Sequence, residues 1–169
     1  MEAGVLSQCR AALERFAPLG CEVEAIDLPF DAEMLWESWT TLRHWAVAGN
    51  LGALYVTPTT RERLKPEAQW EVERGLALSA QDIHVANVQR SDAYRAWSAL
   101  FERFDYLAMP SAQVFPFDVE THWPREIAGR TMDTYHRWME VVIPGTLAGC
   151  PVANVPVGFD ERGRPMGIQ

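Results

Sequence analysis

The stretch from Asp31 to Tyr55 constrains the fold of this chain more than any other. Its apolar residues recur with helical periodicity and form a wide face that is rich in tryptophan: Met34, Leu35, Trp36, Trp39, Leu42, Trp45, Ala46 and Leu51. Asp31 has a side chain typical of a helix N-cap, and Pro58 ends the pattern. We therefore expect a long helix that is buried on more than one side, with its tryptophans packing on a further part of the protein or on a partner.

Helices and short strands alternate along the rest of the chain. Helical periodicity predicts further helices over residues 3–16, 66–78, 79–104 and 131–143. Alternating or short apolar runs predict strands over residues 21–28, 105–109, 152–159 and 165–169, the last two forming a hairpin. Ser79 and Asp82 have the spacing of a helix capping box. This mixed order of helices and strands predicts the α/β fold class.

Length and composition exclude several classes of protein. A chain of 169 residues is long enough for one domain with a hydrophobic core, and no apolar run approaches the ~20 residues of a membrane helix. The net charge of −8, with 15 basic residues scattered among 23 acidic ones, argues against nucleic acid as a partner. The cysteines, Cys9, Cys21 and Cys150, form no CxxC pair, which predicts neither a disulfide framework nor a zinc site and fits the cytoplasm.

No complete catalytic constellation is visible in the residues themselves. There is no GxSxG turn for a nucleophilic serine and no glycine-rich phosphate loop. Cys150 could act as a thiol nucleophile, but its apolar strand context favours a small buried residue. Asp133 and His136 are the only pair spaced for two metal ligands on one helix face, and a surface helix pair explains them better. We assign no catalytic residue, no metal and no cofactor.

Several segments in order resemble the C-terminal half of amidase signature enzymes. The most specific are LAGCPVANVPVGF, Leu147 to Phe159, and GRPMGIQ, Gly163 to Gln169; DYLAMP at Asp105 is a weaker match. The resemblance implies a large α/β/α sandwich around a mixed sheet, and hydrolysis of carboxamides by a serine nucleophile, a second serine joined by a cis peptide, and a lysine. The segments that carry these three groups match no position here, and Lys65 has no serine-rich partner.

The resemblance also predicts what this chain is. Family members continue past the final glutamine, so we expect residues 1–169 to be the C-terminal portion of a single amidase domain, truncated at both ends and inactive alone. The parent enzyme would act on a small-molecule amide and could form a homodimer. In the family the late helix and nearby loops set substrate choice, which makes Trp138, Met139, Ile143 and Thr146 the candidate substrate-binding residues. Packing between helix and sheet is the alternative role, and their apolar character favours an apolar or aromatic amide.

Two other interpretations stay open at this point. The chain could be a stand-alone binding or scaffold protein that keeps the fold and has lost the chemistry. It could also be a new hydrolase that uses Cys150 or the histidines, if folding brings them together.

Overall fold

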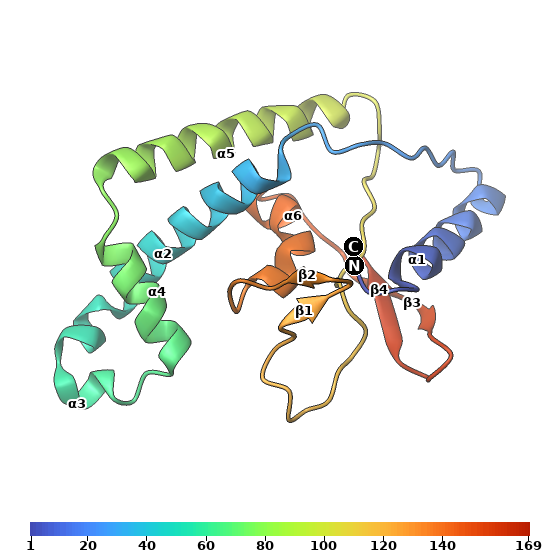
Figure 1. The fold of residues 1–169 in the computed structure, drawn as a ribbon. Coiled ribbons are helices and arrows are strands. Elements are labelled where there is room, and N and C mark those ends of the chain that lie inside the picture. Colours follow the sequence, from blue (N-terminus) through green and yellow to red (C-terminus); the bar gives the residue numbers. More distant parts are fainter. The chain divides into compact units, whose positions relative to one another are not determined.

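The structure, a computed structural model, describes residues 1–169 and divides into two compact units. Leu28–Leu100 form one, which we call the helical unit. Met1–Asp27 and Phe101–Gln169 form the other, which we call the hairpin unit. Figure 1 labels the elements of both, and each unit is described by itself.

The helical unit contains the long apolar helix and three others. Its elements are α2 (Ala32–Val56), α3 (Pro58–Arg61), α4 (Pro66–Leu76) and α5 (Ala80–Leu100). The side chain of Asp31 accepts a hydrogen bond from the Met34 backbone N–H at 2.8 Å, which confirms the predicted N-cap. Before α5, Asp82 Oδ2 accepts from the Ser79 N–H at 2.8 Å and Ser79 Oγ accepts from the Asp82 N–H at 3.1 Å. These reciprocal bonds confirm the capping box.

Helix α2 packs against both α4 and α5, as its wide apolar face predicts. Leu35 and Trp36 of α2, Val72 of α4 and Trp97 of α5 are buried within this unit. The hydroxyl of Ser38, which is fully buried, donates a hydrogen bond to the Ala86 carbonyl oxygen of α5 at 2.8 Å. The helical unit therefore has its own core, with α2 at its centre.

The tryptophans of α2 do not share one environment. Trp36 is 6% exposed and its ring lies 5.7 Å from that of Trp39, whereas Trp45 is 52% exposed. The expectation that all three pack on a missing part or a partner is wrong for Trp36, because neighbouring helices of the same unit already bury it. None of the helices in the chain combines the length and the apolar character needed to cross a membrane.

The hairpin unit begins with a helix and carries two further short helical segments. Helix α1 (Val5–Leu13) continues as the 3-10 helix η1 (Glu14–Leu19), which confirms the predicted N-terminal helix. The 3-10 helix η2 (Arg137–Val142) leads into α6 (Ile143–Ala148). Gly20 and Gly149 follow η1 and α6 with φ of 86° and 70°, a left-handed conformation that favours glycine at helix ends.

The predicted helix over 131–143 is wrong in its first half. Residues 130–131 belong to a small hairpin instead, formed by β1 (Glu126–Ile127) and β2 (Arg130–Thr131). The Met132 N–H donates to the Arg125 carbonyl oxygen at 2.8 Å, and the Met132 side chain packs with Val114 and Trp123 in a local apolar cluster. These tertiary contacts hold the backbone extended where the sequence alone favours a helix.

The predicted C-terminal hairpin is confirmed. Strands β3 (Val155–Phe159) and β4 (Pro165–Ile168) pair antiparallel, with an irregularity between Pro156 and Gly158. The carboxylate of Asp160 organises the turn, because its Oδ1 accepts from the N–H groups of Arg162 and Arg164 at 2.9 and 2.8 Å.

The two other predicted strands are not assigned as strands. Residues 21–28 are extended but exposed throughout, because no neighbouring strand in the chain pairs with them. The segment 105–109 makes strand-like bonds only at its end, where Met109 and Gln169 exchange N–H to carbonyl bonds at 2.9 and 2.8 Å. The sheets of this chain are therefore two separate antiparallel pairs, and these residues do not form the predicted mixed sheet.

Candidate functional site

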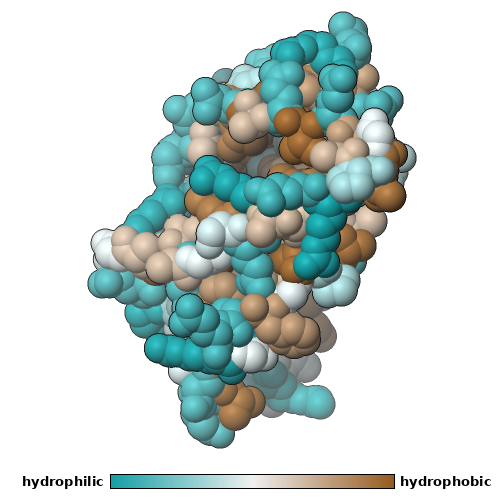
Figure 2. Space-filling view, turned by 90° about the vertical axis from the view of Figure 1, so that its right-hand side faces the viewer, coloured by the Kyte–Doolittle hydropathy of each residue, from teal (hydrophilic) through white to brown (hydrophobic).

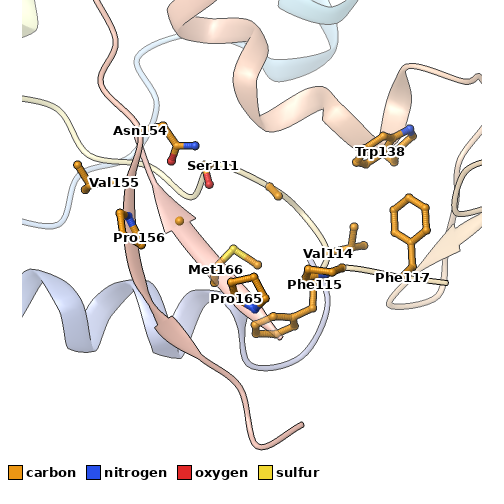
Figure 3. A pocket seen from close by; sticks show the side chains of 13 residues that line it. Ser111, Val114, Phe115, Phe117, Trp138, Asn154, Val155, Pro156, Pro165 and Met166 are labelled. Atoms are coloured by element: carbon orange, nitrogen blue, oxygen red, sulfur yellow. The ribbon is translucent and has the colours of Figure 1, made fainter. Parts of the chain in front are cut away.

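A groove of about 490 Å³ lies in the hairpin unit (Figure 3). Its walls are the extended segment 111–117, the β3–β4 hairpin and Trp138. The Ser111 N–H donates to the Gly167 carbonyl oxygen at 3.1 Å, so the segment begins as a third chain beside β4. The groove is thus built from parts of the sequence that the hairpin and these backbone bonds bring together.

The floor of the groove is apolar and well packed. Phe115 and Met166 line it, and both are buried against Val5 and Cys9 of α1. Burial raises the pKa of the Cys9 thiol, since the apolar surroundings disfavour the thiolate. Cys9 therefore acts as a small apolar residue beneath the groove.

One end of the groove is aromatic. The rings of Phe117 and Trp138 lie 5.5 Å apart at 86°, an edge-to-face contact that stabilises both side chains. Phe117 follows the buried Phe115 by two residues, so alternation along the extended segment places both on the groove side, as Figure 3 shows.

The other end of the groove is polar. Ser111 and Asn154 lie close together there, over Gly167 of β4 (Figure 3). A Cβ at Gly167 would lie 2.5 Å from Ser111 Oγ and 2.7 Å from Asn154 Oδ1, so both oxygens approach the glycine more closely than any side chain would permit. Glycine at 167 therefore leaves room for the polar pair.

Two glutamines fix η2, and with it Trp138, relative to the groove. The buried Gln113 accepts a hydrogen bond from the Val141 N–H through its Oε1 at 3.0 Å. The Gln169 carboxamide donates to the carbonyl oxygens of Pro110 and Val141, both at 3.1 Å. Sequence reasoning missed both glutamines as structural residues, although Gln169 lies in the most specific motif of the chain.

A network of ion pairs begins η2. Arg137 is buried and donates from Nε and Nη2 to the two carboxylate oxygens of Asp133 at 3.0 and 3.1 Å. It also donates to Glu140 at 3.3 Å, which Arg130 bonds at 2.8 Å. These bonds from Arg137 lower the pKa of Asp133. Asp133 thus pairs with Arg137, and no group of three His, Cys, Asp or Glu side chains in the chain is placed to hold a metal ion.

The structure places the four predicted substrate-binding residues differently. Trp138 lines the groove. Met139 is half-buried, Ile143 is buried at 2% exposure, and Thr146 is exposed with its hydroxyl bonded to the Val142 carbonyl oxygen at 3.0 Å. None of these three lines the groove. The residues that meet Trp138 there were not predicted; Asn154 could have been suspected, since it is a polar residue within an otherwise apolar strand motif.

Comparison with known proteins places the chain in a family. A sequence model of the family described as Amidase matches residues 1–169. The chain is 25% identical over 171 residues to a fatty acid amide hydrolase of Medicago truncatula, with 98% of this chain and 27% of that protein covered. It is 29% identical over 187 residues to a glutamyl-tRNA(Gln) amidotransferase component of Synechococcus sp. (strain RCC307), with 98% and 37% covered.

Solved structures agree on the fold. A bacterial aryl acylamidase of the amidase signature enzymes superposes with a TM-score of 0.85 at 21% identity, over 99% of this chain and 36% of that one. A second amidase superposes with a TM-score of 0.81 at 21% identity, over 99% and 37%. These are α/β enzymes, so the predicted fold class is confirmed at this level. This chain spans between 27% and 37% of the length of these relatives. Because the family model matches it from end to end, this chain belongs to the amidase family.

Proposed function

We propose that residues 1–169 are the C-terminal portion of an amidase domain that hydrolyses carboxamide C–N bonds to a carboxylic acid and ammonia or an amine. The observation that carries the proposal is the family match over every residue of the chain. In the complete domain, the β3–β4 hairpin and the segment beside it would contribute strands to the mixed sheet of an α/β/α sandwich. The short share of the relatives that this chain spans supports that arrangement.

The chemistry of amide hydrolysis would come from outside these residues. A nucleophile must add to the amide carbonyl carbon, and the amine must receive a proton as the C–N bond breaks, before water releases the acid. The serine pair and lysine of the family have no counterpart in this chain, whose one lysine, Lys65, lies in the helical unit. We infer that this chain is inactive alone and that it supplies a wall of the substrate pocket.

The groove is the part of this chain that we assign to that wall. Trp138 would contact the substrate directly, because it lines the groove. Met139, Ile143 and Thr146 would act on substrate choice only by positioning η2 and α6. Two relatives are named for a fatty acid amide and for aryl acylamides, which are amides with large apolar parts, and the apolar floor of the groove is compatible with such parts.

The test compares the purified chain with the longer protein that contains it. Release of ammonia or amine is measured with aliphatic and aromatic amides as substrates. We expect no turnover above buffer from residues 1–169, and turnover from the longer protein that serine-directed reagents abolish. Turnover by residues 1–169 that Cys150→Ser removes would contradict the proposal. A longer protein without any amide turnover would instead favour a binding or scaffold protein derived from the same fold.

A further inference from the structure

The polar end of the groove has hydrogen-bonding capacity that the chain itself does not use. Ser111 Oγ and Asn154 Oδ1 converge over Gly167, and no hydrogen bond within the chain engages either side chain. A hydroxyl can donate one hydrogen bond and accept others, and a carboxamide offers both an acceptor oxygen and donor N–H groups. The pair can therefore receive a ligand group that carries one donor and one acceptor side by side.

The remaining surface of the groove selects for an uncharged, apolar body. Phe115 and Met166 form its floor, and Phe117 with Trp138 forms the aromatic end. No charged residue lines the groove. A carboxylate or ammonium group placed there would lose its hydration without gaining a counter-ion, which is strongly unfavourable. This argues against charged substrates such as amino-acid amides.

We propose, on the basis of the proposed function, that the groove binds N-aryl carboxamides. The amide N–H donates to Asn154 Oδ1 and the amide carbonyl accepts from the Ser111 hydroxyl, while the aryl ring lies toward Phe117 and Trp138. An aryl ring suits that end better than an alkyl chain, because offset and edge-to-face ring contacts add to the burial of apolar area. The groove volume of about 490 Å³ falls within the ~300–1,000 Å³ range of small-molecule sites.

Direct binding to the purified chain tests this inference without requiring turnover. ¹⁵N-labelled chain is titrated with acetanilide up to its solubility limit, and the dissociation constant is taken from NMR shifts of the Ser111 and Asn154 backbone N–H and the Trp138 indole N–H. N-methylacetanilide, which lacks the N–H donor, serves as the matched probe. We expect saturable shifts with acetanilide and about tenfold weaker binding of N-methylacetanilide, the loss of one good hydrogen bond.

Matched variants locate the site. Asn154→Leu should weaken acetanilide binding about tenfold and leave N-methylacetanilide binding unchanged, because only the first probe donates to Oδ1. Phe117→Ala should weaken both probes, and Phe159→Ala should weaken neither, since Phe159 is exposed on the same hairpin but does not line the groove. Both Asn154 and Phe117 are exposed enough for these changes to leave the core intact, which thermal unfolding would verify.

The outcomes separate this inference from the proposed function. Absence of saturable shifts, equal affinity for the two probes, or equal effects of Phe117→Ala and Phe159→Ala would overturn the aryl amide site, even if the longer protein hydrolyses amides. Binding of acetanilide with the expected variant pattern would support it, even if the longer protein shows no turnover; in that case only the proposed function fails.

Discussion

Gly75 of α4 lies directly against the carbonyl oxygen of His44 in α2, and a Cβ at position 75 would overlap that oxygen and lie 2.5 Å from the Ala48 Cβ. The two helices therefore cross so closely that only a residue without a side chain fits between them. Because α2 is the centre of the helical unit, this contact sets how closely that unit packs.

Gly75→Ala should destabilise the helical unit by about 1–3 kcal/mol or more, because the new methyl group meets backbone atoms that cannot move away without separating the helices. Chemical denaturation followed by circular dichroism measures the change. Gly49→Ala is the matched control, since a Cβ there meets nothing within 4 Å and α2 should gain about 0.5–1 kcal/mol from alanine. Equal effects of the two variants would show that the crossing is not close.

The Asp133–Arg137 pair should make stability depend on pH. Arg137 lowers the folded-state pKa of Asp133, so the pair stabilises the fold above the unfolded pKa of an aspartate, near ~3.9, and loses this contribution as pH falls through the lower folded pKa. Asp133→Asn should reduce the free energy of unfolding at neutral pH, and the difference from the unmodified chain should vanish in strong acid. Asp105→Asn, at an exposed position, is the control. A difference that stays constant with pH would argue against the ion pair.

Trp138→Ala in the longer amidase should lower kcat/KM for apolar amides about tenfold, a loss of ~1.4 kcal/mol in transition-state binding. The physical reason is the loss of both the groove wall and the ring contact with Phe117. Steady-state kinetics with one aromatic and one short aliphatic amide measure the effect, which should be larger for the aromatic substrate. Phe159→Ala should leave both unchanged, and unaltered kinetics in Trp138→Ala would place the substrate elsewhere.

The isolated chain should self-associate as its concentration rises. Residues 21–28 are extended, and the apolar side chains of Val23 and Ile26 are exposed there among unpaired backbone groups. On the face shown in Figure 2, apolar groups in brown lie among polar groups in teal. Analytical ultracentrifugation should detect dimers or larger species, and Ile26→Lys should reduce them. A monodisperse monomer at high concentration would favour a self-sufficient protein.

Local sequence signals determined the elements that depend on neighbouring residues. Asp31, the Ser79–Asp82 box and the alternation around the C-terminal hairpin each act through hydrogen bonds or packing a few residues away, and the structure has them where the sequence predicts. The family, too, followed from contiguous motifs, since the order of residues from Leu147 to Gln169 is readable without a fold.

Tertiary structure decided what depends on distant partners. Residues 21–28 have the alternation of a strand, yet a strand forms only where another chain segment pairs with its backbone, and none does here. The groove joins Ser111, Trp138 and Asn154, which are separated by long stretches of sequence and meet because 109–111 pairs beside β4 and two glutamines hold η2 in place. No spacing rule encodes such a meeting, because it results from packing and hydrogen bonds that form only once the chain has folded.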